Sequence, residues 1–291
     1  MTYNELWRQL AQVYDDGEAK ALARMAYEVR FGLTFADLCL GKDTQLSADC
    51  QAELEEIARR LLNEEPIQYI LGEATFCGRT FTVNEHVLIP RPETEELCRW
   101  ILQNLTRKQA PCEVDDTGGQ PPCTILDIGT GSGCISVTLA AEIPQAQVTG
   151  WDISASALAV ARENARRHNV SATFEQVDVL SPHPSSLISH FSLIVSNPPY
   201  ICNKERARME RNVLDHEPHE ALFVPDDDPL LFYRAIARYA ANALKPGGWL
   251  YFEINPLYAD DLQALLSAMR FYLIETHSDQ YGKQRMLRAQ R

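Results

Sequence analysis

Residues 124–134 read TILDIGTGSGC. The first five are an apolar run with one acid, Asp127, as expected for a buried strand, and a helical pattern begins at Cys134. Gly129, Gly131 and Gly133 lie between them, and glycine lets the backbone turn sharply and approach a ligand closely. The G-x-G-x-G spacing differs from the G-x-G-x-x-G of dinucleotide enzymes. Because Asp127 is a poor neighbour for a pyrophosphate, we expect a neutral or cationic ligand here.

The same alternation of strand and helix continues after this loop. Runs that read as strands occur at 124–128, 147–152, 172–178, 191–196, 249–254, 271–276 and 284–289. Helical patterns occupy 154–168, about 229–244 and 257–269, and KPGG at 245–248 is expected to form a turn. Strands that alternate with helices predict an α/β fold with a mostly parallel, doubly wound sheet.

Two further acids follow the next two predicted strands. Asp152 in WDIS is placed to accept both hydroxyls of a ribose, although a helix cap together with Ser154 is an alternative. Asp178 is placed to accept from an adenine amino group with Val179 packed on the ring, and its alternative role is a solvated turn aspartate. Acids and glycines at neighbouring strand ends indicate one crevice. We favour S-adenosylmethionine, which combines adenosine with a sulfonium and has no phosphate.

Residues 195–200, VSNPPY, end the fourth predicted strand, because proline cannot continue a central strand. A strand-ending turn explains Asn-Pro alone. Beside the proposed sulfonium, however, the Asn197 oxygen and the Pro198 carbonyl are suited to hold both hydrogens of a planar NH2 group. Tyr200 is expected to cover the flat face of the substrate. This is catalysis by position and hydrogen bonding, with no strong general base required.

The amino-terminal part predicts helices and then a hairpin. Helical spacing appears in residues 1–13, 19–31 and 47–62. A hairpin with Gly78 at its turn follows, and a helix is expected from Pro92 to Leu105. Residues 106–122 have no periodicity and are expected to form a surface loop or linker.

Composition bounds the function. The chain has 291 residues, of which 45% are hydrophobic, and a net charge of −13, which disfavours a broad nucleic-acid face. Its eight cysteines form neither a C-x-x-C pair nor a zinc pattern, so no metal is expected. The start has no signal-peptide pattern, and no apolar run reaches membrane-spanning length. We expect free thiols and a reducing, cytoplasmic location.

DIGTGSG, WDIS and NPPY together resemble class I methyltransferases that modify planar nitrogens. The segment EPIQYILGEATFCGRTFTVNEHVLIPRPETEEL, together with EPHEAL at 217–222, is similar to the HemK/PrmC family. That resemblance implies methyl transfer to the glutamine nitrogen N5 in the GGQ motif of peptide chain release factors. It also implies a helical substrate-docking domain at 1–73, a hairpin and linker at 74–105, and a methyltransferase domain at 106–291.

The residue patterns and the resemblance together assign roles to particular residues. The expected cofactor-binding residues are Gly129, Thr130, Gly131, Ser132, Gly133, Asp152, Asp178, Val179 and Asn197. The expected substrate-binding residues are Arg91, Asn197, Pro198, Pro199 and Tyr200, of which Asn197, Pro198 and Tyr200 are the expected catalytic residues. Arg91 is expected either to pair with Glu93 or Glu95 and shape the cleft, or to form a surface ion pair. His216 and His219 are expected to line a loop.

The chain departs from the family pattern at two positions. Val179 stands where the family often has tryptophan or phenylalanine, and Asn255 replaces a glycine in FEIN. Because asparagine tolerates a left-handed backbone, we expect little effect at Asn255. Two other functions stay open at this point. A nucleic-acid adenine or guanine N-methyltransferase shares NPPY but predicts a basic recognition region, and a non-catalytic scaffold does not require NPPY.

The tripeptide Gly118, Gly119 and Gln120 repeats the sequence that this family modifies. Chance gives such a tripeptide in roughly one chain of this length in fifteen, so chance is the preferred explanation. The alternative is an internal pseudosubstrate. Intact mass after incubation with cofactor tests it: no added methyl on the peptide that contains Gln120, and no effect of Gln120→Ala on rate, would reject the pseudosubstrate.

Overall fold

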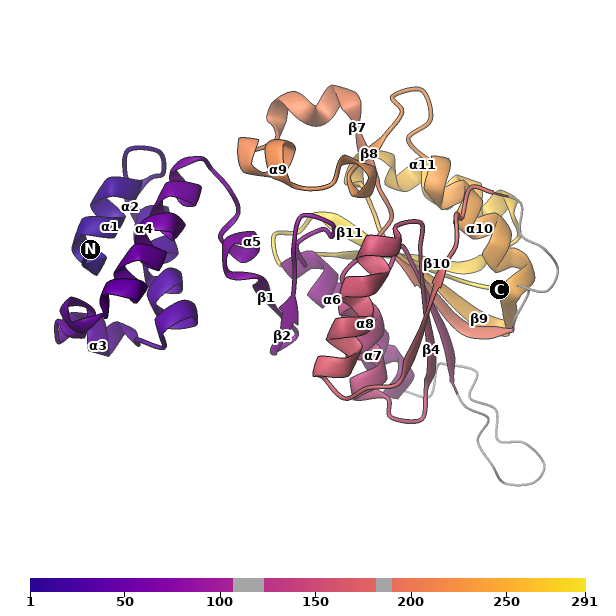
Figure 1. Cartoon of the computed structure of the whole chain (residues 1–291). Coiled ribbons are helices and arrows are strands. Elements are labelled where there is room, and N and C mark those ends of the chain that lie inside the picture. The colour runs from indigo at the N-terminus through magenta and orange to yellow at the C-terminus, as the bar shows by residue number, and fades with distance from the viewer. Residues whose placement is uncertain (107–122, 182–189) are drawn as a thin grey trace. The chain divides into compact units, whose positions relative to one another are not determined.

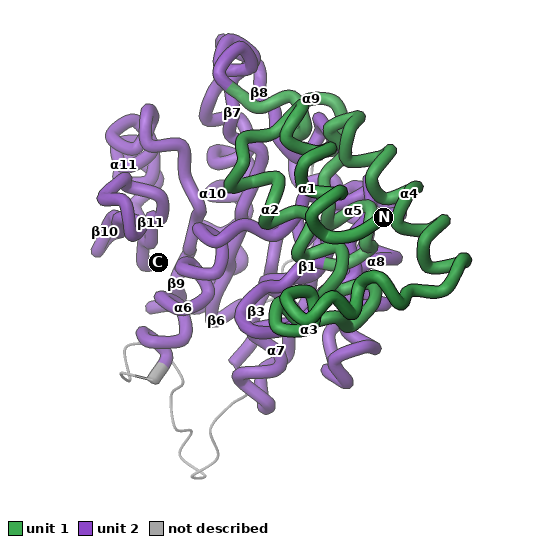
Figure 2. Tube along the Cα trace, turned by 90° about the vertical axis from the view of Figure 1, so that its left-hand side faces the viewer, with its two compact units in different colours: residues 1–73, 209–217 green, residues 74–208, 218–291 purple. Residues whose placement is uncertain are grey.

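The computed structural model of the chain describes residues 1–106, 123–181 and 190–291. The chain divides into two compact units, coloured separately in Figure 2. The first contains residues 1–73 and 209–217, and the second contains residues 74–208 and 218–291. Apart from residue 106, the expected linker with its GGQ tripeptide lies outside the described residues.

The first unit is built from short helical segments. They are α1 Tyr3–Leu10, α2 Asp16–Met25, the π-helical η1 Ala26–Arg30, α3 Phe35–Cys39, the 3-10 segment η2 Lys42–Gln45, α4 Ala48–Leu62, α5 Ile67–Leu71 and α9 Arg211–His216. Side chains of Thr2, Asp15, Thr34 and Ser47 accept backbone hydrogen bonds at four helix starts. The apolar faces of α1, α2, η1, α3, α4 and α5 form a separate core.

The second unit is organised around a seven-stranded sheet (Figure 1). Its strands are β3 Thr124–Ile128, β4 Gln147–Asp152, β5 Ala172–Gln176, β6 Phe191–Ser196, β9 Leu244–Glu253, β10 Tyr272–Ser278 and β11 Gln284–Gln290. They lie in the order β10-β11-β9-β6-β3-β4-β5, with β9, β6, β3, β4 and β5 parallel and β11 antiparallel to its neighbours. The predicted doubly wound, mostly parallel sheet is confirmed.

Helices cover both faces of this sheet, because successive strand residues point to opposite sides. Ile125 packs into the core that contains residues of α6 Pro92–Thr106, α7 Cys134–Glu142 and α8 Ala155–Arg167. Its neighbour Leu126 packs into the core that contains residues of α10 Leu231–Ala243 and α11 Ala259–Ala268. The result is a three-layer arrangement in which the central strands β3 and β6 are buried.

The order of the strands contains a switch point. From β3 the chain adds β4 and then β5 on one side, and it later adds β6 and then β9 on the other. Loops that leave β3 and β6 therefore separate at their carboxyl ends, which is where open α/β sheets bind ligands. The glycine loop follows β3, and NPPY follows β6.

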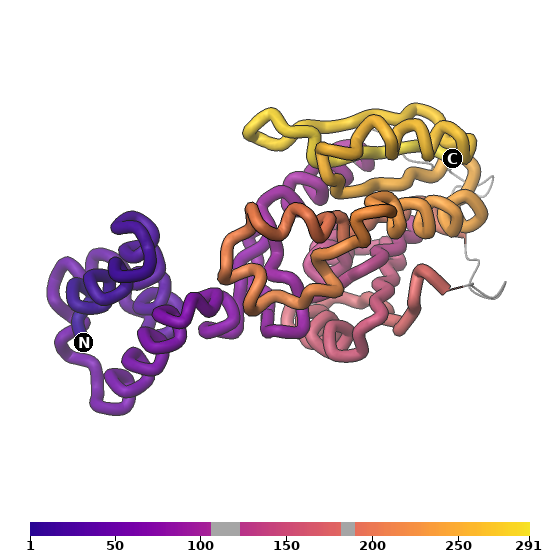
Figure 3. The backbone as a smooth tube through the Cα atoms, turned by 90° about the horizontal axis from the view of Figure 1, so that it is seen from above, coloured from indigo at the N-terminus to yellow at the C-terminus, as the bar shows by residue number. Residues whose placement is uncertain are grey.

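The carboxyl-terminal part differs from expectation at KPGG. These residues lie inside β9, where the pairing with β6 shifts register between Phe191 with Leu244 and Leu193 with Trp249. The expected turn is therefore a strand irregularity, because Leu244 already pairs with β6 directly after α10. The final strands β10 and β11, yellow in Figure 3, are present as predicted, and β10 forms a sheet edge.

Two smaller strand pairs flank the sheet. β1 Glu73–Phe76 and β2 Arg79–Thr82 form the predicted hairpin, with positive φ at Cys77 and Gly78 in its turn. After NPPY, β7 Ile201–Cys202 pairs in parallel with β8 Phe223–Val224. The segments around this second pair are η4 Asn203–Arg208, η5 His219–Ala221 and, after β9, η6 Pro256–Tyr258. The strands β7 and β8 are absent from the sequence prediction.

Candidate active site

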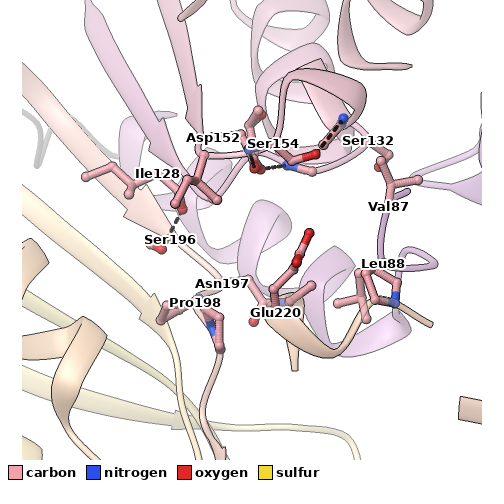
Figure 4. A pocket seen from close by; sticks show the side chains of 18 of the residues that line it. Val87, Leu88, Ile128, Ser132, Asp152, Ser154, Ser196, Asn197, Pro198 and Glu220 are labelled. Carbon is pink, nitrogen blue, oxygen red and sulfur yellow. Dashed lines mark hydrogen bonds between the residues drawn. The ribbon is translucent and has the colours of Figure 1, made fainter. Parts of the chain in front are cut away.

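A cavity of about 230 Å³ opens at the switch point of the sheet (Figure 4). Its walls come from the ends of β3, β4 and β6, from the segment after β5 and from the chain before α6. The predicted site residues that line it are Arg91, Gly129, Thr130, Gly131, Ser132, Asp152, Asp178, Val179, Asn197, Pro198 and Pro199. Gly133 and Tyr200 are the predicted site residues that do not line it.

The glycine loop is held against β4 by its backbone. The N–H groups of Gly129 and Thr130 both donate to the carbonyl of Trp151, at 2.8 and 2.9 Å. Gly129, Gly131 and Gly133 all have positive φ, a conformation that costs glycine little. At Gly133 a Cβ would also lie 3.0 Å from the Cβ of Ala161. Gly133 thus allows α7 to begin close to α8.

Asp127 supports this loop from inside the protein. It is fully buried, and its Oδ2 accepts from the hydroxyls of Thr130 and Ser136, both at 2.7 Å. Burial raises the pKa of Asp127 to about 6, and the hydrogen bonds from Thr130 and Ser136 limit the rise. The expectation that Asp127 faces the ligand is wrong, because Asp127 does not line the cavity.

Asp152 at the end of β4 faces the cavity and also joins two loops. Its Oδ2 accepts from Gly131 N and its Oδ1 from Ser154 N, both at 2.9 Å. Burial raises the pKa of Asp152, these backbone hydrogen bonds lower it, and the nearby charge of Glu220 raises it further. The cap of α8 is the hydroxyl of Ser154, which accepts from Ala157 N. Each carboxylate oxygen of Asp152 keeps capacity for a second donor.

Asp178 and Val179 follow β5 and form another part of the wall. Asp178 accepts from Leu180 N at 2.9 Å and from the Ser181 hydroxyl at 2.7 Å, so it organises its own turn while lining the cavity. Val177 and Val179 contribute an apolar surface beside it. This part of the cavity combines an acceptor with an apolar face.

Asn197 stands at the end of β6, opposite the glycine loop. A Cβ on Gly129 would lie 3.9 Å from the Asn197 carbonyl oxygen, so the two loops begin side by side before they diverge. The side-chain nitrogen of Asn197 donates to Thr94 Oγ1 at 3.1 Å, and the Thr94 hydroxyl donates to Glu253 Oε2 at 2.6 Å. Thr94 and Glu253 are buried, and neither is among the predicted site residues.

Tyr200 is directed into the protein. Its hydroxyl donates to Glu253 Oε1 at 3.0 Å, and its ring packs against the core beside α10. Asn255 donates from Nδ2 to the Tyr200 carbonyl at 3.1 Å and adopts an extended conformation at φ −75°. The left-handed conformation considered for Asn255 is therefore not used. Its amide anchors the exit from NPPY.

Glu220 is a cavity residue that sequence reasoning missed. It belongs to η5, and Figure 4 shows its carboxylate pointing into the cavity. EPHEAL is a recognisable segment, but nothing in its spacing shows which of its side chains faces the ligand. His216 and His219 do not line the cavity, and His219 packs edge-on against Phe223 instead.

A buried asparagine fastens the hairpin to the glycine loop. Asn164 on α8 donates to the carbonyls of Thr82 and Ser132 at 2.9 and 2.8 Å, and it accepts from Thr82 N at 2.7 Å. Both amide hydrogens of Asn164 and its oxygen are engaged in these bonds. The helical pattern alone gives no signal for this role.

Within residues 1–106, 123–181 and 190–291, no cluster of three or more His, Cys, Asp or Glu side chains could hold a metal ion. In the same residues, no helix combines the length and apolarity needed to cross a bilayer.

The sheet order, the glycine loop after β3, the acid after β4 and the Asn-Pro turn after β6 define a class I methyltransferase. Two family models match the chain, the PrmC N-terminal domain over residues 3–72 and the methyltransferase small domain over residues 117–219. Among solved structures, the hMettl16 catalytic domain gives a TM-score of 0.53 at 15% identity, covering 72% of this chain and 74% of that one. A methyltransferase from Pyrococcus furiosus gives 0.51 at 14% identity, covering 84% and 98%.

Two relatives named release factor glutamine methyltransferase match along nearly the whole chain. The protein from Bacteroides thetaiotaomicron is 45% identical over 284 residues, which cover 98% of this chain and 97% of that protein. The protein from Flavobacterium psychrophilum is 40% identical, with coverage of 96% and 94%. The chain belongs to the release factor glutamine methyltransferase family.

Proposed function

We propose that this protein transfers a methyl group from S-adenosylmethionine to the side-chain nitrogen N5 of the glutamine in the GGQ motif of peptide chain release factors. One observation carries the proposal within this family. Asn197 and Pro198 line the same cavity as the glycine loop, and they lie across that cavity from Asp152. A planar amide can meet a methyl donor there.

The cavity residues fit this cofactor. Asp152 offers carboxylate oxygens with spare acceptor capacity, as the two hydroxyls of a ribose require. Val177, Val179 and Phe232 provide apolar surface for a flat ring. Arg91 is the single Lys or Arg among the described lining residues, so the wall is not a phosphate cradle. When bound, S-adenosylmethionine supplies an electrophilic methyl group.

The chain's own residues act on the substrate amide by position. An amide nitrogen is a weak nucleophile, because its lone pair is delocalised. Acceptance of its two hydrogens by the Asn197 oxygen and the Pro198 carbonyl favours a pyramidal nitrogen with its lone pair directed at the methyl carbon. Pro198 and Pro199 keep these groups rigid, since each proline has a fixed φ.

We further propose that residues 1–73 dock the release factor and that residues 106–291 carry out methyl transfer. Residues 74–105 form the hairpin and linker that connect these two parts. The separate core of the first unit supports a docking role. A cytoplasmic location is part of the proposal, supported by the seven cysteines among the described residues that are free thiols.

The proposal is tested by methyl transfer from labelled cofactor to a purified, unmethylated release factor, with a GGQ→GGA variant and duplex DNA in parallel. We expect label on the factor, loss of label in the variant and none on DNA. Label on DNA would replace the proposal with a nucleic-acid N-methyltransferase. Absence of label on every substrate, with cofactor still bound, would indicate that the protein binds the cofactor without catalysing transfer.

A further inference from the structure

We infer that Thr94 and Glu253 are positioning residues that fix the orientation of the Asn197 side-chain amide, so that its oxygen faces the substrate. This inference rests on the proposed function, because the orientation matters only if Asn197 must accept hydrogen bonds from a substrate NH2 group. It adds to that function the residues that determine which atom of Asn197 is presented.

The three side chains form a continuous hydrogen-bonded chain. Asn197 Nδ2 donates to Thr94 Oγ1 at 3.1 Å, and Thr94 Oγ1 donates to Glu253 Oε2 at 2.6 Å. The other carboxylate oxygen, Oε1, accepts from the Tyr200 hydroxyl at 3.0 Å. Only 3% of Thr94 and 2% of Glu253 are exposed, and burial favours hydrogen bonds between these groups over hydrogen bonds to water.

The donor and acceptor of each of these hydrogen bonds follow from the chemistry of the Glu253 carboxylate. An ionised carboxylate can only accept hydrogen bonds, so the single hydroxyl proton of Thr94 must point to Glu253. Thr94 Oγ1 then has only lone pairs left for Asn197. An amide oxygen placed there would face another acceptor, so the amide nitrogen takes this position and Oδ1 is turned away from Thr94. The carboxylate thereby sets the orientation of an amide that it does not touch.

Protonation of Glu253 would remove this control. A neutral carboxyl group can donate to Thr94, whose hydroxyl could then donate to the Asn197 oxygen and reverse the amide. Burial raises the pKa of Glu253, while hydrogen bonds from Thr94 and Tyr200 lower it. Glu93 in the first turn of α6 raises the pKa of Glu253, Arg285 on β11 lowers it, and Tyr233 on α10 also lies near the group.

The contacts join three elements that are distant in sequence. Thr94 lies in the first turn of α6, Asn197 follows β6 and Glu253 ends β9. The Thr94 to Glu253 contact spans 159 residues, and the Asn197 to Thr94 contact spans 103. The segment RPETEEL and the NPPY turn therefore contribute side chains to the same hydrogen-bond network.

The test uses the full chain with its release factor substrate and compares Thr94→Val, Thr94→Ser, Glu253→Gln and the control Thr138→Val. Valine keeps the shape of threonine without the hydroxyl. Thr138 is also buried in the second unit, on α7, and its hydroxyl has no partner among the described residues. Three quantities are measured: kcat, cofactor affinity by calorimetry, and inhibition by a release factor whose motif is GGE.

We expect Thr94→Val and Glu253→Gln to lower kcat by about 10- to 100-fold with cofactor affinity unchanged. Thr94→Ser should restore most of kcat. The GGE factor should inhibit the two defective variants more strongly than wild type, because an amide nitrogen that faces the substrate donates hydrogen bonds to the carboxylate of the GGE glutamate. In wild type, kcat should fall at acid pH as Glu253 is protonated, and Glu253→Gln should lack that fall.

Wild-type kcat in Thr94→Val would overturn the inference, as would a loss of kcat without any change in GGE inhibition. An equal loss in Thr138→Val would also overturn it, since general packing would then be the cause. If Thr94→Val does not fold, the pH profiles of wild type and Glu253→Gln decide. Failure of wild type itself to methylate the GGQ factor would instead reject the proposed function.

Discussion

The carboxylate of Asp152 accepts a hydrogen bond from the backbone N–H of Gly131 across 2.9 Å. This contact joins the end of β4 to the tip of the glycine loop after β3, so the acid and the loop are positioned together. A ligand that uses one of them necessarily meets the other.

Asp152→Asn is expected to weaken cofactor binding. The amide keeps the shape of the carboxylate, but half of it becomes a donor that cannot accept a ribose hydroxyl. We expect the Kd for S-adenosylmethionine, measured by calorimetry, to rise about 10-fold or more. Asp260→Asn, on the exposed surface of α11, is the matched control and should leave the Kd unchanged. An unchanged Kd in Asp152→Asn would mean that Asp152 only supports the loop.

Asn197→Ala is expected to abolish methyl transfer while cofactor binding persists. The substitution removes the acceptor that we propose holds the reacting amide, so we expect a loss of about 100-fold or more in kcat. Single-turnover transfer and cofactor calorimetry on the same preparation separate the two effects. Turnover equal to wild type would show that Asn197 does not hold the substrate.

The free energy of unfolding should decrease between about pH 4 and 6 because of Asp127. Its pKa rises from an ordinary 3.8 to about 6 on folding, so the folded state binds the proton more tightly than the unfolded state. The bound proton therefore adds on the order of 3 kcal/mol to the free energy of unfolding at pH values below the unfolded pKa. This contribution is lost as pH rises through the folded pKa.

Denaturant unfolding at several pH values, in wild type and Asp127→Asn, measures this contribution. The variant cannot titrate at this position, so its free energy of unfolding should lack that decrease. Asp227→Asn, at an exposed position, should follow wild type. Parallel pH profiles for wild type and Asp127→Asn would show that Asp127 does not titrate in this range.

Asn164→Ala is expected to destabilise the protein by about 3 kcal/mol, because it leaves Thr82 and Ser132 with unsatisfied backbone groups. The midpoint of urea unfolding measures this loss. Asn242→Ala, at an exposed position of α10, also removes an asparagine hydrogen bond, to the Arg238 carbonyl, and should change stability little. Similar losses in both variants would refute the special role of Asn164.

Sequence reasoning located the parts of the site that lie at strand ends. Asp152 and Asn197 each follow an apolar run directly, and parallel strands bring their carboxyl ends to one edge. Their placement on the cavity was predictable, because it follows from the order of strands and the period of the sheet.

The parts that were missed depend on which way side chains point. Asp127 lies on the same face of β3 as Ile125, so it faces α7 and not the cavity, and strand alternation alone does not show which face the ligand uses. Tyr200 bonds to Glu253, which lies 53 residues away. Such contacts between distant elements are set by packing and leave no local pattern in the sequence.

The most direct measurement is tandem mass spectrometry of a release factor after incubation with the protein and S-adenosylmethionine. We predict a single added methyl group on the side-chain nitrogen of the GGQ glutamine, absent when Asn197→Ala is used. A methyl group on a carboxylate or on another residue of the factor would contradict the central claim. That claim is that Asn197 holds the planar side-chain amide of the substrate glutamine for methyl transfer.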